Sequence, residues 1–264
     1  MSFTSFYNDL SQNPNLLSHW FPAVKDCGMR VPRTEIIPVP EHVAEAFFME
    51  RQDKDFEIIY RWVKEMVMPI AKQFPYYGNT PFLFMKNGSF SDKFNARNCY
   101  VRRDAPELTM KLMDMNYDAI MVDAYGIYGI TELILREYIP YTKGKVPCIY
   151  NGLPLRPEFR VFYDFDEHRT LYSVNYWDWD YCHDAISQIA TDQIIYEKMY
   201  PVLSKQYDVW RDAVEKEVEK SMKTVTGLSG RWSVDILLDE TDTLWLIDMA
   251  VARQSAYWDP EKCR

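Results

Sequence analysis

The charged residues with the most suggestive spacing are Glu158 and Arg160, which lie in the sequence Pro157-Glu-Phe-Arg-Val-Phe-Tyr163. Apolar residues alternate with them, and this alternation predicts a strand on which Glu158 and Arg160 share one face. A carboxylate and a guanidinium two residues apart could bind different parts of one polar ligand. The alternative is an ordinary ion pair on the face of a sheet.

A second pair of charged residues lies near the C-terminus. Asp235 and Asp248 interrupt two otherwise apolar strands, Arg231–Leu238 and Leu244–Met249. If the turn between these strands centres on Thr241-Asp242, the two carboxylates lie opposite each other and share a face. Like charges on a buried face repel unless a cation neutralises them, and Mg²⁺ bound to phosphate oxygens would do so. Alternatively, each carboxylate only accepts hydrogen bonds near a strand end.

A lysine-bearing strand and loop could bind phosphate. The apolar strand Pro81–Lys86 runs into the loop Asn87–Arg97, which contains Gly88 and Lys93. A rigid strand can aim the ammonium group of Lys86, and loop N–H groups can surround phosphate oxygens. The sequence is not a Walker A motif, which requires Gly-x-x-x-x-Gly-Lys-Ser/Thr. A solvated hairpin loop is the alternative.

The elements that must position these residues can be predicted in outline. Short strands are expected at 35–39, at 98–101 and at 133–139, the last stopped by Pro140. Residues 41–73 have helical spacing, with a break near Asp53. A helix capped by Asp104 should extend to Val122, before Gly126 and Gly129. Residues 184–223 read as two helical pieces broken at Pro201.

The sequence Arg136-Glu-Tyr-Ile-Pro140, followed by Glu158-Phe-Arg-Val-Phe162, resembles the hinge and next strand of ATP-grasp proteins. It is most similar to the branch that includes the cell division cycle protein 123 family and its bacterial and phage relatives. The resemblance runs from about Met29 to the C-terminus. It implies that backbone groups of Glu137, Tyr138 and Ile139 hold adenine. Glu158 would hold the ribose, and Arg160 would face phosphate or substrate.

The same resemblance assigns the remaining site residues. It implies that Lys86, Ser91 and Lys93 contact phosphates and that Asp235 and Asp248 bind Mg²⁺. Members of the superfamily usually end the last strand with Asp/Glu-x-Asn, whereas this chain has Asp248-Met-Ala250. The second metal contact is therefore in doubt, and Gln254 or Ser255 could replace it.

The implied fold is an α/β (α+β) ATP-grasp fold, in which two lobes with antiparallel sheets clamp a nucleotide. Residues 1–29 would form a short N-terminal segment. Residues 30–130 would form the small lobe with the phosphate loop. Residues 131–264 would hold the hinge and the large lobe with the magnesium site.

Composition limits the class of protein. The chain has 264 residues, enough for a sizeable core, and a net charge of −9, which argues against a nucleic-acid partner. The five cysteines include no Cys-x-x-Cys pair, so we expect reduced thiols and no zinc site. No signal peptide and no apolar run of about 20 residues is present, so we expect a cytoplasmic protein without a membrane span.

The leading functional hypothesis is an ATP-dependent carboxylate–amine (or related) ligase that forms an acyl phosphate. Arg160 and Lys93 would stabilise the transferred phosphoryl group. The substrate would be a small molecule or a peptide or protein carboxylate, which the sequence does not identify. Two alternatives are an ATP-binding assembly chaperone or protein-binding module, which would have a protein client, and an ATP-dependent phosphotransferase.

Overall fold

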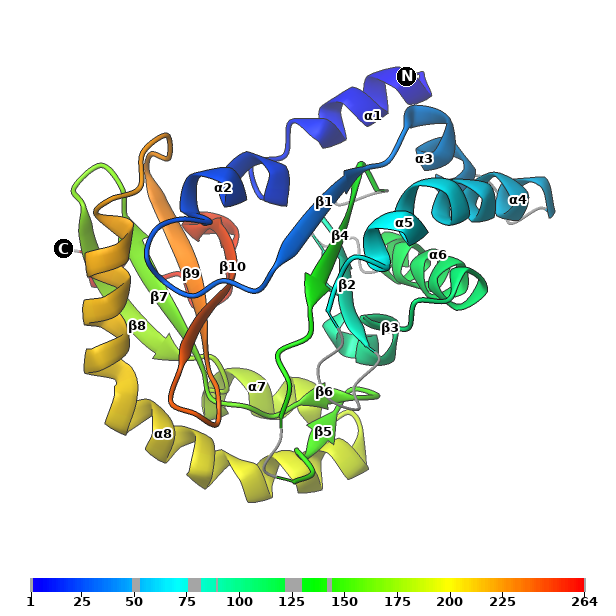
Figure 1. Ribbon diagram of the computed structural model, residues 1–264. Coiled ribbons are helices and arrows are strands. Elements are labelled where there is room, and N and C mark those ends of the chain that lie inside the picture. Colours follow the sequence, from blue (N-terminus) through cyan, green and yellow to red (C-terminus); the bar gives the residue numbers. More distant parts are fainter. Residues whose placement is uncertain are drawn as a thin grey trace. The chain divides into compact units, whose positions relative to one another are not determined.

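The computed structural model describes residues 2–48, 53–75, 82–88, 90–121, 130–141 and 144–263 (Figure 1). The chain forms two compact units. Unit 1 comprises Met1–His19 and Arg33–Pro140, and unit 2 comprises Trp20–Pro32 and Tyr141–Arg264. The boundary at Pro140 differs from the one expected near residue 130, because the strand that precedes it pairs within the sheet of unit 1.

Unit 1 is built on an antiparallel sheet with the strand order β1-β4-β2-β3. The strands are β1 (Thr34–Pro38), β2 (Leu83–Asn87), β3 (Tyr100–Val101) and β4 (Glu132–Glu137). β4 lies between β1 and β2, which explains the complete burial of Leu133, Ile134 and Leu135. The expected strands are therefore present, although the hinge strand ends at Glu137 and Pro81 lies outside the described residues.

The helices of unit 1 supply most of its core. They are α1 (Phe3–Ser11), α3 (Glu41–Phe48), α4 (Asp53–Trp62), a π-helical turn η1 (Val63–Val67), α5 (Met68–Ala71), a 3₁₀ segment η2 (Lys93–Asn98) and α6 (Ala105–Met121). The helix α2 (Leu17–Val24) contains the change from unit 1 to unit 2. The buried side chains of α3 to α6 pack with alternate residues of the strands, including Leu83, Met85, Leu133 and Leu135.

Helix α6 begins as the sequence predicted. The backbone N–H of Glu107 donates to the Asp104 carboxylate at 2.9 Å, so Asp104 caps the first turn. The predicted apolar face is buried at Leu108, Leu112, Met115 and Ala119. Val122, Gly126 and Gly129, expected at the end of the helix, lie outside the described residues.

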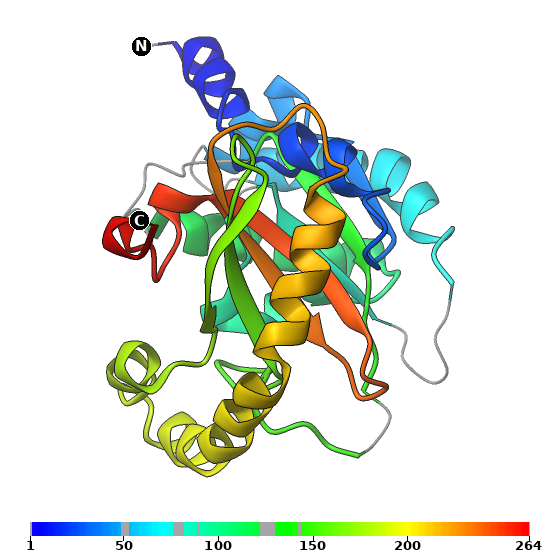
Figure 2. The same ribbon diagram turned by 90° about the vertical axis from the view of Figure 1, so that its left-hand side faces the viewer.

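Unit 2 contains a second antiparallel sheet, with the order β10-β9-β7-β8. Its strands are β7 (Glu158–Asp164), β8 (Arg169–Asn175), β9 (Arg231–Leu238) and β10 (Leu244–Val251). The remaining elements are β5 (Cys148–Ile149), β6 (Leu153–Pro154), α7 (Trp179–Ile186), α8 (Ala190–Met222), and the 3₁₀ turns η3 (Ala252–Gln254) and η4 (Pro260–Cys263). Figure 2 shows the C-terminal half of α8 lying across one face of this sheet.

Helix α8 runs from Ala190 to Met222 without interruption, so the prediction of two pieces broken at Pro201 is wrong. A proline inside a helix removes one backbone hydrogen bond and costs about 3 kcal/mol. Buried side chains on both sides of Pro201, including Tyr196 and Leu203, hold the neighbouring turns in place. Packing therefore offsets the local preference, and the helix curves along its length (Figure 1).

A bulge sets the register between β9 and β10. Leu244 lies opposite Leu238, but the extra residue Ile247 shifts the register and brings Asp248 opposite Asp235. The expected pairing of these two aspartates is therefore confirmed. The bulge produces it, because Ile247 would otherwise lie opposite Asp235.

No helix among the described residues is long and apolar enough to cross a bilayer. The five cysteines are all free thiols.

Candidate functional site

Arg160 and Asp235 form the central contact on one face of the unit 2 sheet. They are cross-strand neighbours on β7 and β9. The Nε and Nη2 groups of Arg160 donate to the two carboxylate oxygens of Asp235 at 2.8 and 2.7 Å. The two side chains are only 11% and 9% exposed. This two-point contact fixes the plane of the guanidinium.

Arg160 has donors beyond those that bind Asp235. A guanidinium carries five N–H groups. Two bind Asp235, and one on Nη1 donates to the carbonyl oxygen of Ala256 at 3.3 Å. The other two make no hydrogen bond within the described part of the chain. The ring of Tyr176 lies 5.1 Å from the guanidinium carbon. A fixed, partly satisfied cation of this kind can bind an anion without reorganising.

The environment of Arg160 keeps it charged. Burial opposes its charge, but the attraction and hydrogen bonds of Asp235, with contributions from Tyr176 and Asp248, raise the pKa of the guanidinium above its ordinary value. The cation is therefore independent of pH in the range where proteins fold.

Glu158 lies on the same face as Arg160. It is half-buried, and it lies opposite Leu237 of β9. The residue between them, Phe159, faces α8, where its ring centroid is 5.7 Å from that of Tyr207. The alternation predicted from the sequence is thus confirmed, and Glu158 and Arg160 occupy the face away from α8.

Asp248 brings another carboxylate to this face, opposite Asp235. Its Oδ1 accepts the backbone N–H of Met249 at 3.1 Å. The oxygens of Asp235 each bind Arg160 through one lone pair, and a carboxylate oxygen has a second. Two carboxylates suit Mg²⁺, which takes few protein ligands together with phosphate oxygens and water. Among the described residues, no three His, Cys, Asp or Glu side chains are grouped closely enough to hold a metal ion.

Two serine hydroxyl groups lie near Ala250, the position where the superfamily usually has asparagine. Ala250 lies opposite Ser233, two residues along from the Asp248–Asp235 pair. The hydroxyl of Ser233 is 2.7 Å from that of Ser255. Ser255, one of the two residues named as a replacement for the asparagine, is therefore held against this part of the sheet.

Lys86 is the candidate phosphate ligand on the unit 1 sheet. It is buried near the end of β2, opposite Ile134 of β4. Met85, next to it, belongs to the core formed with the helices. Since strand side chains alternate, Lys86 faces away from that core. A rigid strand therefore carries the ammonium group, as the sequence predicted.

The loop after β2 holds Ser91 and Lys93 close together. The N–H of Lys93 donates to the carbonyl oxygen of Ser91 at 2.6 Å. The Lys93 ammonium lies 5.6 Å from the ring centroid of Phe94, which is 48% exposed. Both candidate residues are half-buried at the start of η2.

The residue between them, Asp92, anchors the loop and was not identified from the sequence. Its carboxylate is buried and accepts from Asn98 Nδ2 at 2.8 Å, and the same amide lies 3.4 Å from Asp118 of α6. Asn95 also donates to Asp118, at 3.1 Å. Burial, with the negative charges of Asp118 and Asp114, raises the pKa of Asp92 to about 7 despite the opposing bond from Asn98. The only sequence signal that could have indicated Asp92 is its place between Ser91 and Lys93 in the Ser-x-Lys motif.

Gly88 and Glu132 fix the other end of this loop. The N–H of Gly88 donates to the backbone carbonyl of Glu132 at 3.1 Å. Glu132 is buried, and a Cβ atom added to Gly88 would overlap its side chain. Position 88 therefore requires glycine, because the Glu132 side chain lies too close to its backbone for a Cβ atom. The sequence reading included Gly88 in the loop but gave Glu132 no role.

The hinge is bound to the entry of β1. The N–H of Glu137 donates to the Arg33 carbonyl at 2.8 Å, and the Glu137 carboxylate accepts the Arg33 N–H at 3.1 Å. Arg33 also donates to the Gln73 carbonyl at 2.8 Å. Tyr138 follows, with its ring 5.6 Å from that of Tyr100. The hinge backbone therefore has a defined position in unit 1.

Comparison with solved structures identifies the fold. The structure of Cdc123 from Schizosaccharomyces pombe overlaps with a TM-score of 0.54, covering 95% of this chain and 88% of that chain at 15% identity. Cdc123 represents the ATP-grasp branch that the sequence motifs resemble. The chain has the ATP-grasp fold. The α+β architecture with two antiparallel sheets agrees with this assignment.

Two other solved structures overlap less well. One is the biotin carboxylase domain of Hydrogenobacter thermophilus 2-oxoglutarate carboxylase with MgADP, ADP and bicarbonate (13% identity, TM-score 0.41, 90% of this chain and 39% of that chain). The other is N5-carboxyaminoimidazole synthase from Aspergillus clavatus with ADP and 5-aminoimidazole ribonucleotide (12%, 0.39, 92% and 45%). TM-scores below 0.5 say nothing about function. No protein-family model and no curated protein matches the sequence.

Proposed function

We propose that the chain binds Mg-ATP and uses it for ATP-dependent ligation of a carboxylate to an amine or related nucleophile. The observation that supports this most strongly is the setting of Arg160. Asp235 holds its guanidinium by two hydrogen bonds, and two further N–H groups bind no described residue. Glu158 and Asp248 lie on the same face of the sheet.

Each residue of unit 2 has a distinct role in this proposal. Glu158 accepts hydrogen bonds from the ribose hydroxyl groups. Asp235 and Asp248 hold Mg²⁺, which when bound neutralises phosphate charge. Arg160 donates to phosphate oxygens and stabilises the charge that develops during transfer. In this proposal Asp235 therefore binds both the guanidinium of Arg160 and Mg²⁺.

The residues of unit 1 have proposed roles of their own, toward the base and the phosphates. Backbone groups of the hinge, from Glu137 to Ile139, hold the adenine; the N–H of Glu137 itself already donates to the Arg33 carbonyl. Lys86 and Lys93, with Ser91, contact phosphate oxygens. Ligation then follows two steps: a substrate carboxylate takes the γ-phosphoryl group and releases ADP, and the nucleophile attacks the acyl phosphate and releases phosphate. The protein contributes chiefly orientation and charge.

An ATP-binding assembly factor is the second candidate. The sequence motifs resemble the branch that includes the cell division cycle protein 123 family, and an assembly factor of that kind would have a protein client. Turnover separates the two functions. A ligase produces ADP continuously only when both the carboxylate and the nucleophile are present, whereas an assembly factor binds ATP with little turnover and retains a protein.

Binding of ATP to lysine variants tests the proposal. We expect Lys86→Ala and Lys93→Ala each to weaken ATP binding by about 1.5–3 kcal/mol, the usual value of a charge-assisted contact. Lys198→Ala, which removes an exposed lysine of α8, is the matched control and should bind like the parent. If both loop variants melt and bind ATP like the parent, the phosphate-loop assignment is wrong.

A further inference from the structure

The C-terminal segment 252–263 is part of the sheet layer that carries Arg160. The ring of Trp258 lies 5.3 Å from that of Phe162 and 6.4 Å from that of Tyr172. The N–H of Asp259 donates to the Tyr172 hydroxyl at 2.7 Å. The segment is therefore bound on the same face as Phe162, two residues along β7 from Arg160.

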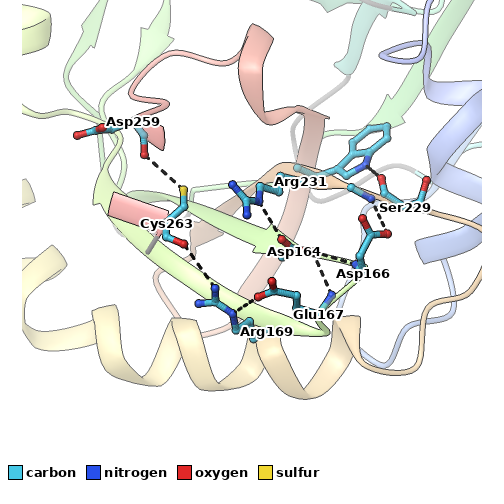
Figure 3. A network of polar contacts seen from close by, with 10 residues as sticks. Asp164, Asp166, Glu167, Arg169, Ser229, Arg231, Asp259 and Cys263 are labelled. Atoms are coloured by element: carbon cyan, nitrogen blue, oxygen red, sulfur yellow. Dashed lines mark hydrogen bonds and ion pairs between the residues drawn. The ribbon is translucent and has the colours of Figure 1, made fainter. Parts of the chain in front are cut away.

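A polar network fastens the far end of this segment (Figure 3). The Cys263 thiol donates to the carbonyl of Asp259 at 3.4 Å, and the Cys263 carbonyl accepts from Arg169 at 3.5 Å. Beside them, Arg231 binds the buried Asp164 at 2.9 Å. The turn between β7 and β8 thus holds the end of the chain.

Two contacts of Arg160 other than Asp235 lead to one residue of this segment, Tyr257. The first is the carbonyl of Ala256, which precedes Tyr257 and accepts from Arg160 at 3.3 Å. The second is the ring of Tyr176, 5.1 Å from the guanidinium. The Tyr257 hydroxyl donates to the backbone carbonyl of Tyr176 at 2.7 Å.

The backbone of Tyr257 has a conformation that its surroundings must impose. Its φ is +67°, in the left-handed region that a bulky residue rarely adopts. Its hydroxyl lies 3.3 Å from Cys182 Sγ, and its ring lies 4.2 Å from that of Tyr181. Burial raises the pKa of the Tyr257 hydroxyl, so it remains a neutral donor. This conformation turns the Ala256 carbonyl towards Arg160 while the hydroxyl reaches Tyr176.

We propose that Tyr257 is a positioning residue for Arg160, acting through the Ala256 carbonyl and the Tyr176 ring. This rests on the proposed function, in which Arg160 binds phosphate. Asp235 fixes one edge of the guanidinium, and Tyr257 fixes the Nη1 group and the ring beside it. The two N–H groups of Arg160 that bind neither Asp235 nor Ala256 are then held in one fixed orientation. The C-terminal segment thereby becomes part of the nucleotide site without touching the nucleotide.

The test compares two tyrosine hydroxyl groups on opposite faces of the sheet. Tyr257→Phe removes the bond to Tyr176, and Tyr207→Phe removes a comparable bond of 2.9 Å to the Ser173 carbonyl. Each hydroxyl also lies near a second polar atom, Ser173 Oγ for Tyr207 and Cys182 Sγ for Tyr257, so both variants lose comparable part-buried contacts and should melt at slightly lower temperatures. We expect only Tyr257→Phe to weaken ATP binding in calorimetric titration, by about fivefold to tenfold.

A double-mutant cycle shows whether the effect passes through Arg160. In an Arg160→Lys background, which removes the planar guanidinium, Tyr257→Phe should change ATP affinity by less than twofold. If Tyr257→Phe does not fold, Tyr176→Leu replaces it, because it removes the ring contact and leaves the backbone bond. Parent affinity in the single variant, or an undiminished effect in the Arg160→Lys background, overturns the positioning role. Failure of the parent to bind ATP would instead overturn the proposed function.

Discussion

Both units bury a carboxylate beside residues proposed to bind ATP, and each unit compensates it differently. In unit 2 the partner of Asp235 is a cation, Arg160, at 2.7 Å, and the charges cancel. In unit 1 the neighbours of Asp92 are an amide and two further carboxylates, so burial and repulsion raise the pKa of Asp92 to about 7. Arg160 keeps its charge because its pKa is raised, whereas the pKa of Asp92, at about 7, places its titration near neutrality.

This difference separates the properties of the two units. On the face of the unit 2 sheet, the guanidinium of Arg160 should stay charged as the pH changes, because its pKa is raised above the ordinary value. The anchor of the loop with Ser91 and Lys93 should depend on pH, because Asp92 gains or loses a proton. Removing one partner of a buried ion pair is costly, because the other charge stays buried without compensation. Replacing a buried carboxyl of raised pKa by an amide should cost little.

The largest expected effect comes from breaking the pair in unit 2. Arg160→Met should lower the free energy of unfolding by about 3–5 kcal/mol, because Asp235 is left buried without a cation. The double variant Arg160→Met/Asp235→Leu should recover most of this loss. Urea denaturation measures both, with Lys220→Met as the control, since Lys220 is 75% exposed and its pair with Glu217 should contribute little. An equal loss in the single and double variants would contradict the account of this pair.

An intermediate effect is expected at the start of the loop in unit 1. Gly88→Ala should destabilise the protein by about 1–3 kcal/mol, because the new Cβ overlaps the buried side chain of Glu132. Glu132→Ala in the same chain should relieve most of that cost. If the losses in the free energy of unfolding are additive in the double-mutant cycle, the new Cβ and the Glu132 side chain do not clash.

The effect expected at Asp92 is a dependence of stability on pH. A carboxyl whose folded pKa is raised stabilises the protein fully below its unfolded pKa, near 4, and loses that contribution as pH rises through the folded value of about 7. Stability should therefore fall between about pH 4 and pH 7 from this residue. Asp92→Asn should remove this part of the slope, as seen in urea midpoints at several pH values, whereas the exposed Asp208→Asn should not. A parent slope retained in Asp92→Asn would exclude Asp92 as its source.

Local patterns were sufficient to predict much of the fold. Period-two alternation located β7, apolar runs on either side of a polar turn located β9 and β10, and the cap at Asp104 located the start of α6, because these signals lie within a few residues. Pro201 misled, since only packing of distant residues keeps α8 continuous through it. Asp248 lies opposite Asp235 because of a β-bulge at Ile247, and the sequence of the turn does not predict that bulge.

Partners far apart in the sequence were not predictable. Asp235 was expected to bind a metal and Arg160 a phosphate, yet the two residues, separated by 75 positions, bind each other. Glu132 and Asp92 had no pattern to mark them, because their importance comes from burial and from neighbours on other elements. Motif resemblance identifies residue types in a site, whereas their contacts depend on the folded chain.

The central claim is that Asp248 and Asp235 bind Mg²⁺ together with ATP phosphates, and calorimetric titration of ATP tests it most directly. Parent and Asp248→Asn are each titrated with and without magnesium. We predict saturable binding of one ATP to the parent, strengthened by magnesium, and a loss of about tenfold or more in Asp248→Asn only when magnesium is present. No saturable binding by the parent, or equal losses with and without magnesium, would contradict the claim.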